Sequence, residues 1–280
     1  MNDTIAAGIL LADKPAGISS HDVVARARHA LGLRRIGHAG TLDPFATGLL
    51  IVLVGRATRL QRYFMALPKT YDVVAQLGAR STTGDPEGEV VRTGVFPPEP
   101  LQLPHGRILQ RPPAYSAVKV DGERAYARAR RGETVELAER EVEVFDAREI
   151  SREDDRVSLR VVCSSGTYVR SIVSELGDAY CLELRRSAIG PFDVDGAWPT
   201  QGPVSLLDVG EACARFMEVV EVGEADALAI SHGRSIGAAG EVGPGPVLLV
   251  GATGALAVAE LRRGVAGRPM LAPSVGLHDQ

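Results

Sequence analysis

The stretch GHAGTLDPFATGLLIVLVG, residues 37–55, places one acid, Asp43, in a turn of Gly, Ala, Thr and Pro directly before a run of apolar residues. An acid that only improves solubility does not need such surroundings, and a buried charge needs a partner. The glycines let another segment or a ligand approach the backbone closely, and Pro44 stiffens the residue after the acid. The pattern suits a carboxylate held rigidly at the edge of a cleft, although Asp-Pro in a loop is also a common turn former.

Length and composition are those of a globular protein. The chain has 280 residues, 45% hydrophobic and 24% charged, enough for one large domain or two ordinary ones. The run GLLIVLVG is shorter than the roughly 20 residues that span a membrane, and the N-terminus lacks a signal-peptide pattern. The three cysteines and six histidines show no metal-binding spacing. We therefore expect a cytoplasmic protein without a membrane segment or a structural metal.

The net charge of −4 disfavours a nucleic-acid partner when taken alone, but the charges are unevenly distributed. Residues 1–70 carry nine Lys or Arg against four Asp or Glu, and Arg34 and Arg35 are adjacent. A second cluster, residues 107–131, carries seven basic residues and two acids. Basic patches on an acidic protein steer a polyanion locally, whereas the plainer interpretation is a set of solvated helix faces.

Hydrophobic periodicity and capping residues predict the order of the elements. Strands are expected at 8–15, 70–78, 134–149, 156–163 and in LELRRSAIG (182–190). Helices are expected at 19–32, 57–67, 123–131 and 167–180. The Gly- and Thr-rich residues 34–48 and the proline-rich residues 94–114 are expected to be loops. This order predicts a mixed α/β (α+β) fold.

A shift in composition divides the chain. After about residue 203 the sequence turns Gly- and Val-rich with short strand-like segments, and a hairpin is expected around Gly251–Gly254. We therefore expect a catalytic-sized domain at 1–216 and a small β-rich domain at 217–280.

Arg170 is the candidate partner of Asp43. It lies in CSSGTYVRS, in the first turn of an expected helix, where a cation is unfavourable for the helix dipole. A nearby carboxylate that Arg170 keeps ionised and oriented would explain its position, and a surface arginine at a helix end is the alternative. His38, Tyr71 and Tyr168 are flat, amphipathic side chains. One interpretation is that they stack on a nucleobase, which stabilises binding by about 1–3 kcal/mol per base. The alternative is that they are ordinary core or rim residues.

Six segments, in order, resemble motifs of the TruB-type tRNA pseudouridine synthases. They are GILLADKPAGISSHDVV (8–24), GHAGTLDPFATGLLIVLVGRATR (37–59), KTYDVVAQLG (69–78), RPPAYSAVKVDGERAY (111–126), CSSGTYVRSIVSELG (163–177) and LRRSAIGPF (184–192). The resemblance covers residues 8–195 and implies a pseudouridine-synthase-like mixed sheet flanked by helices. The C-terminal segments ISHGRSI (230–236) and GALAVAELRRG (254–264) are similar to a PUA-like RNA-binding domain.

The resemblance also implies roles for single residues. Asp43 falls on the catalytic aspartate of the family, Tyr71 on its active-site tyrosine and Arg170 on the arginine that pairs with the aspartate. Positions that contact the RNA or the target uridine correspond to His38, Tyr168 and Leu184. Lys14 lies in the DKP motif, next to the site. The chain departs from the family at Ser165, where Lys is usual, and in DAYCLE (178–183), which is commonly longer.

The implied reaction isomerises uridine to pseudouridine at position 55 in the T loop of tRNA, after the base is flipped out of the folded RNA. Asp43 attacks the ribose C1′, attacks uracil C6 or deprotonates the sugar, and the sequence leaves these three open. No metal, redox cofactor or obligate protein partner is implied. The alternatives are a guide-dependent RNA pseudouridine synthase, a non-catalytic tRNA-binding or folding protein, and a glycosidase, for which no motif supplies the second acid.

Overall fold

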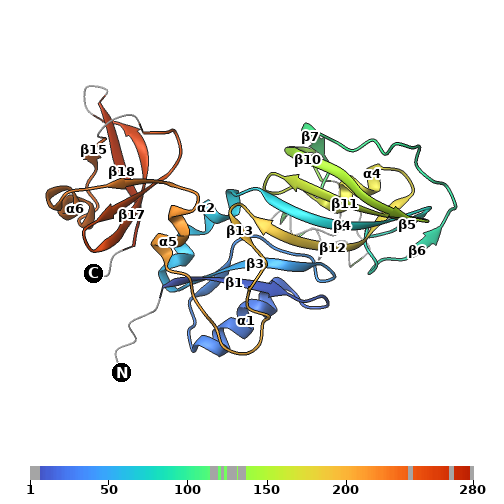
Figure 1. Cartoon of the computed structure of the whole chain (residues 1–280), viewed down its shortest axis with the longest axis horizontal. Coiled ribbons are helices and arrows are strands. Elements are labelled where there is room, and N and C mark those ends of the chain that lie inside the picture. The colour runs from blue at the N-terminus through green and yellow to red at the C-terminus, as the bar shows by residue number, and fades with distance from the viewer. Residues whose placement is uncertain are drawn as a thin grey trace.

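The computed structural model describes residues 7–113, 119–120, 123–124, 131, 137–238, 242–264 and 268–277. Figure 1 shows a large sheet with helices beside it and a smaller sheet at one end of the molecule. Within these residues no helix combines the length and the apolar character that crossing a membrane requires.

A nine-stranded sheet forms the centre of the described chain, in the order β1-β3-β12-β4-β11-β10-β7 with β2 and β13 at its margins. Its strands are β1 (Gly8–Lys14), β2 (Ile36–His38), β3 (Thr47–Val54), β4 (Lys69–Leu77), β7 (Gly106–Gln110), β10 (Arg140–Glu153), β11 (Arg156–Cys163), β12 (Ala179–Ile189) and β13 (Phe192–Asp193). The pairing of β3 with β12 is parallel, and the other pairs are antiparallel. This sheet confirms the mixed α/β class.

Strand β3 is buried on both faces, which explains the unbroken apolar run after Asp43. Leu49 and Ile51 belong to one core, whereas Leu50 and Val52 belong to another, in which helix α1 (Ser20–Leu31) packs. A strand covered on both sides has no solvent-facing positions, so its sequence does not alternate. The turn that carries Asp43 is therefore anchored at its C-terminal end by two cores.

Helix α1 begins and ends where the sequence predicts. Ser19 caps it in a capping box with Asp22, and Gly32 ends it in the left-handed region at φ 66°. Tyr71, Val73 and Leu77 of β4 share one buried face, as the alternation in this strand predicts.

Some expected boundaries are wrong. Residues 34–48 are not all loop, because β2 pairs with β3, and the expected loop 94–114 contains β7, which lies between its prolines and pairs with β10. The helix expected at 57–67 begins as a 3₁₀ helix, η1 (Gly55–Leu60), followed by α2 (Gln61–Ala66). The helix expected at 167–180 is α4 (Val169–Glu175), because Gly177 turns the chain at φ 129° into β12. Such pairings and turns depend on distant neighbours, which local patterns do not contain.

Two small hairpins complete the first part of the chain. They are β5 (Ala79–Ser81) with β6 (Val90–Arg92) and β8 (Lys119–Val120) with β9 (Glu123–Arg124). The basic helix expected at 123–131 lies mostly outside the described residues, and its first two residues form strand β9.

The smaller sheet has five strands in the order β14-β16-β17-β18-β15. They are β14 (Glu218–Glu221), β15 (Ile236–Gly237), β16 (Val247–Gly251), β17 (Gly254–Arg263) and β18 (Pro269–Gly276), with helices α5 (Val209–Ala214) and α6 (Glu224–Ser231). Gly251 pairs with Gly254, which confirms the expected hairpin. One core cluster joins Phe64 of α2 to Leu248 and Val258 of this sheet, and the division at residue 216 stays a prediction.

Candidate active site

The loop that carries Asp43 is held by hydrogen bonds to residues around the start of α1. The Lys14 Nζ donates hydrogen bonds to the carbonyls of Pro15, Ile18 and Pro44, at 2.9, 2.8 and 3.0 Å. The Leu42 N–H donates to the Ser20 Oγ at 2.9 Å. The backbone on both sides of Asp43 is therefore fixed to one helix terminus.

Lys14 supports the loop and is not among the residues that line the pocket. Its side chain is 0% exposed, and burial lowers its pKa to about 8, while the Asp43 carboxylate opposes this shift. The ammonium group is therefore still charged at neutral pH. Lys14 contacts the Pro44 carbonyl, directly after Asp43 in the chain.

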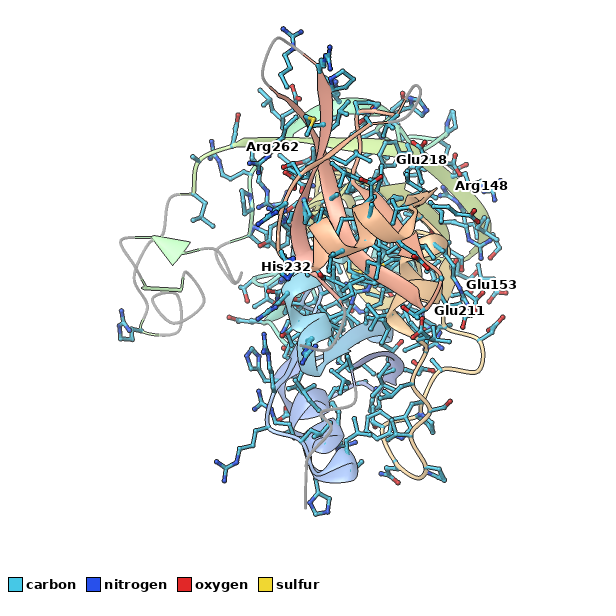
Figure 2. All side chains as sticks on the ribbon, turned by 90° about the vertical axis from the view of Figure 1, so that its left-hand side faces the viewer. Arg148, Glu153, Glu211, Glu218, His232 and Arg262 are labelled. Atoms are coloured by element: carbon cyan, nitrogen blue, oxygen red, sulfur yellow. The ribbon has the colours of Figure 1, made fainter. Side chains whose placement is uncertain are left out.

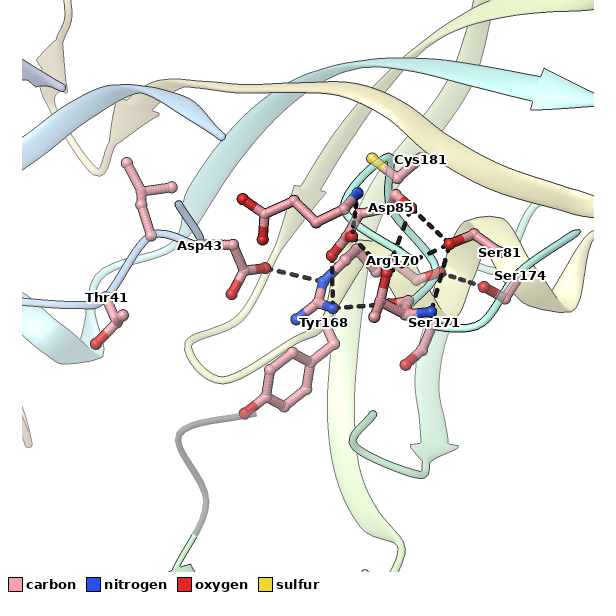
Figure 3. A network of polar contacts seen from close by, with 12 residues as sticks. Thr41, Asp43, Ser81, Asp85, Tyr168, Arg170, Ser171, Ser174 and Cys181 are labelled. Atoms are coloured by element: carbon pink, nitrogen blue, oxygen red, sulfur yellow. Dashed lines mark hydrogen bonds and ion pairs between the residues drawn. The ribbon is translucent and has the colours of Figure 1, made fainter. Parts of the chain in front are cut away.

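Arg170 and Asp43 lie together, although 127 positions separate them in the chain. The Arg170 Nε is 2.9 Å from the Asp43 Oδ2, and the arginine is 3% exposed whereas the Asp43 side chain is 29% exposed (Figure 3). Arg170, a residue of α4, is buried, and the Asp43 carboxylate lines a pocket. The cation in the first turn of α4 thus has the carboxylate neighbour that its position called for.

A second acid, Asp85, shares the same guanidinium. The Arg170 Nη1 lies 2.9 Å from the Asp85 Oδ2 and donates to the Thr83 carbonyl at 2.8 Å. The other Asp85 oxygen accepts hydrogen bonds from Thr83 Oγ1 and from the Glu87 N–H. Sequence reasoning missed Asp85, because STTGDPEG signals only a turn. Its function follows from the geometry: it fixes the side of Arg170 that faces away from Asp43.

Burial and charge act against each other on Asp43. Burial raises its pKa above the ordinary value for aspartate, and the nearby Asp85 carboxylate raises it further. The Arg170 guanidinium opposes both effects. Removal of water strengthens the attraction within the pair but makes each charge costly, and Arg170 favours the ionised form of Asp43.

A pocket of about 240 Å³ opens above this pair. Five of the seven expected site residues line it: Asp43, Tyr71, Tyr168, Arg170 and Leu184. Tyr71 of β4 lies opposite Arg186 of β12 in the sheet register. Burial raises the pKa of the Tyr71 phenol, although a hydrogen bond with Arg186 opposes this, so the side chain is a neutral phenol at neutral pH. The pocket thus combines an anion, a buried phenol and apolar walls, as a site for a flat polar ring does.

The buried Arg186 holds the wall of the pocket. Its Nε donates to the Leu49 carbonyl at 2.7 Å, and its Nη1 and Nη2 donate to the carbonyls of Thr41 and Gly40. Arg186 therefore ties β12 to the Asp43 loop from inside the protein. The match to LRRSAIGPF indicated this segment, but no spacing indicated that Arg186 would be buried.

Tyr168 stands at the pocket mouth between two polar side chains. Its backbone N–H donates to the Gln110 Oε1 at 2.7 Å, and the Gln110 Nε2 donates to its carbonyl at 2.9 Å. The Arg140 guanidinium lies 4.7 Å from the centre of the Tyr168 ring and donates to the Gly166 carbonyl. Gln110 and Arg140 were not expected from the sequence, because they come from β7 and β10, far from the GTY motif.

His38 does not line the pocket. It lies on β2, its ring packs edge-on against His21 at 5.3 Å, and its carbonyl accepts a hydrogen bond from Gln61 of α2. It is therefore beside the loop that carries Asp43, on the side of η1 and α2. Among the described residues no group of three or more His, Cys, Asp or Glu side chains is arranged to hold a metal ion.

Comparisons with known proteins identify chains similar to this one. The family model "TruB family pseudouridylate synthase (N terminal domain)" matches residues 28–169. A tRNA pseudouridine synthase B of Corynebacterium efficiens is 43% identical over 84% of this chain and 86% of its own length. The protein of the same name from Thermobifida fusca is 42% identical over 93% of this chain and 96% of its own length.

Solved structures show the same fold. A chain in the crystal structure of a Cbf5–Nop10–Gar1 complex superposes with a TM-score of 0.66 and 24% identity, covering 96% of this chain and 84% of its own length. A chain of an H/ACA RNP bound to a substrate RNA containing 2′-deoxyuridine also gives 0.66, with 22% identity and coverage of 97% and 85%. These two likenesses show the architecture.

Proposed function

The chain belongs to the TruB family of pseudouridylate synthases, and we propose that the uridine it isomerises in tRNA is the one at position 55, in the T loop. The observation that carries the proposal is the Asp43 carboxylate, 2.9 Å from the Arg170 guanidinium, at the surface of the pocket. The relatives at about 40% identity are named for tRNA, which supports tRNA over a guide-dependent substrate. We place this reaction in the cytoplasm.

The isomerisation breaks the bond between uracil N1 and ribose C1′, forms a bond from C5 to C1′, and moves one proton from C5 to N1. No electron or atom is gained or lost, so the chemistry itself requires no redox partner. The base must first leave the stack of the RNA loop, at a cost of a few kcal/mol. Stacking on Tyr71 offsets part of this cost, and Tyr168, braced by Arg140, bounds the other side of the opening.

In this proposal Asp43 acts as an ionised carboxylate, by attack on C1′, by attack on C6 or by removal of a sugar proton. Arg170 keeps the carboxylate charged and oriented, and Asp85 keeps Arg170 in place. Tyr71 is a neutral phenol, so it assists the removal of the proton from C5 as a relay. Its hydroxyl oxygen accepts that proton while the hydroxyl gives up its own. His38 contacts RNA outside the pocket, and Leu184 packs against the base.

The test uses an unmodified tRNA transcript and the Asp43→Asn variant. The amide keeps the shape of the side chain but has no negative charge, so we expect RNA binding to stay within about twofold and turnover to fall by more than about 10⁴-fold. Single-turnover pseudouridine formation, with binding measured separately, checks this.

The matched control is Asp72→Asn, which removes a carboxylate that is paired with Arg160 at 2.7 Å on the outside of the same sheet. This variant should keep full activity. Product formation by Asp43→Asn at the wild-type rate would remove Asp43 from the reaction. Pseudouridine in a transcript whose position 55 is cytidine would contradict the proposed target.

A further inference from the structure

We propose that His21 is a positioning residue for His38, and that the first turn of α1 fixes how the His38 ring stands relative to the Asp43 carboxylate. The His21 ring meets the His38 ring edge-on, with the ring centroids 5.3 Å apart and the ring planes at 83°. Aromatic pairs favour this arrangement, because the edge of one ring is positive and the face of the other is negative. The inference rests on the proposed function, in which His38 contacts the RNA outside the pocket.

The stability of α1 does not account for a histidine at position 21. Ser19 and Asp22 already cap the helix, because the Ser19 N–H donates to Asp22 Oδ2 at 2.7 Å and the Asp22 N–H donates to Ser19 Oγ at 3.2 Å. The buried face of the helix is formed by other residues, whereas His21 is exposed. Histidine is also a weaker helix former than alanine. The edge-on contact with His38 is therefore the feature that explains this side chain.

The residue before His21 holds the other end of the same segment. The Leu42 N–H donates to the Ser20 Oγ at 2.9 Å, and this hydroxyl donates to the Leu42 carbonyl at 3.3 Å. Ser20 is 1% exposed, so these two hydrogen bonds are shielded from water. The Cα atoms of adjacent residues are about 3.8 Å apart. Two neighbouring positions of one helix therefore hold His38 at one end and Leu42, the residue before Asp43, at the other.

The backbone between these two ends is also fixed. The Ala39 N–H donates to the Ile51 carbonyl at 2.9 Å, and Arg186 donates to the carbonyls of the next two residues. With the backbone held in this way, the main freedom left at the end of β2 is the rotation of the His38 ring. The edge-on contact with His21 restricts this rotation.

The orientation of the His38 ring matters because two groups must meet one RNA loop at the same time. The Asp43 carboxylate reacts with the flipped nucleotide inside the pocket, and His38 contacts the RNA beside it. A histidine side chain has three staggered wells at χ1 and two broad orientations at χ2, about six arrangements in all. Without the His21 ring, the arrangement that suits the RNA would be populated for as little as about one sixth of the time.

The location of α1 lets this contact be tested without disturbing the rest of the fold. The helix packs against β1 and β2 of the large sheet, and its outer face is exposed. Figure 1 shows α1 beside the large sheet, and Figure 2 shows it below the smaller sheet. A substitution at position 21 therefore changes the contact with His38 and leaves the packing of the smaller sheet intact.

The test measures kcat/KM on an unmodified tRNA transcript for His21→Ala, His21→Phe, His38→Ala and the double variant of His21→Ala with His38→Ala. Phenylalanine keeps a flat ring for the edge-on contact but has no N–H that could bind a phosphate. The matched control is His29→Ala, which removes an exposed histidine from the last turn of the same helix. Urea unfolding of each variant is measured in parallel.

We expect His21→Ala to lower kcat/KM about 3–6-fold, in line with the number of ring arrangements that it releases. His21→Phe and His29→Ala should stay within about twofold of the wild type. In the double variant, His21→Ala should add nothing to the effect of His38→Ala, because the ring that His21 positions is then absent. The unfolding midpoints of His21→Ala and His29→Ala should agree.

Four results would overturn the proposal. They are wild-type kcat/KM for His21→Ala, equal losses for the alanine and phenylalanine variants, additive losses in the double variant, and a lowered unfolding midpoint for His21→Ala alone. Equal losses would mean that His21 binds RNA through its own N–H, and additive losses would mean that it acts without His38. Asp43→Asn in the same assay reports separately on the proposed function, which stands if this variant is inactive while the histidine effects are additive.

Discussion

At the scale of single residues, one guanidinium organises the site. Arg170 lies between the loop of Asp43 and the loop of Asp85, and it holds both carboxylates at 2.9 Å. Two acids on one cation leave a net negative charge, which the buried Lys14 helps to balance. The pKa of Asp43 is therefore lowered by Arg170 and Lys14 and raised by Asp85.

The pH dependence of turnover should separate the effects of Arg170 and Asp85 on the pKa of Asp43. Only ionised Asp43 is active in the proposed reaction, so kcat/KM falls as the pH drops through the pKa of Asp43. Arg170→Gln removes the charge that opposes the raised pKa, and the acid limb should move to higher pH, with turnover lower by about 100-fold. Asp85→Asn removes a negative charge, and the limb should move to lower pH.

The measurement is kcat/KM against pH for the wild type and both variants. Glu141→Gln is the matched control, because it removes an exposed carboxylate 3.6 Å from Arg107, and its profile should coincide with that of the wild type. Shifts of the two variants in the same direction would exclude a direct electrostatic effect on Asp43.

The sequence predicts the pair of Asp43 and Arg170 because each charge stands in an unfavourable place. Asp43 lies in a turn of small residues before an apolar run, and Arg170 lies in the first turn of a helix. The sequence does not indicate Asp85, Gln110 or Arg140. Each of these acts on a partner that is distant in the chain, through a contact that only the fold creates. The spacing of residues along the chain does not contain such contacts, so only the folded structure shows them.

At the scale of elements, the parallel contact of β3 with β12 positions the loop of Asp43. Gly48 lies opposite Arg186 at φ 103°, and a Cβ built on it would be 2.3 Å from the Arg186 carbonyl oxygen. The opposing atoms belong to the backbone, which cannot move aside. Only glycine permits this approach.

Gly48→Ala should therefore force β12 away and displace Arg186 from the carbonyls of Gly40 and Thr41. We expect a loss of stability of about 3 kcal/mol or more, together with a large loss of turnover. Gly37→Ala is the matched control in the same segment, because its nearest atom would be a Thr58 methyl at 3.8 Å. Urea unfolding of both variants checks this, and equal stabilities would refute the close approach.

The long elements are predictable where the cause is local. The capping box of α1 and the alternation in β4 each depend on residues that are close together in the sequence. Both elements have the expected bounds to within one residue. Strands β2 and β7 are not predictable in this way, because β3 and β10 supply their hydrogen-bond partners.

At the scale of the whole molecule, the two sheets share a core. Phe64, Phe192 and Phe216 form an aromatic cluster, and Leu248 and Val258 of the smaller sheet belong to the same buried set. Removal of residues after 216 would expose this surface to water. The composition shift predicts a boundary, and the apolar packing across it depends on the fold.

We therefore expect one cooperative thermal transition for the complete chain. Phe216→Ala should lower the free energy of unfolding by about 2–4 kcal/mol and still give one transition. Differential scanning calorimetry checks this, with Phe96→Ala, an exposed aromatic away from the junction, as the control. Two separate transitions in the wild type would show that the sheets unfold independently.

The shared guanidinium also has a consequence for evolution. A homologue that loses Asp85 keeps a buried arginine with one of its two ion pairs, and a homologue that loses Arg170 keeps two carboxylates that repel each other. Each single loss is therefore less favourable than keeping all three side chains. Drift at positions 43, 85 and 170 should therefore be correlated, and grafting the Asp43 turn alone onto another scaffold should yield an inert protein.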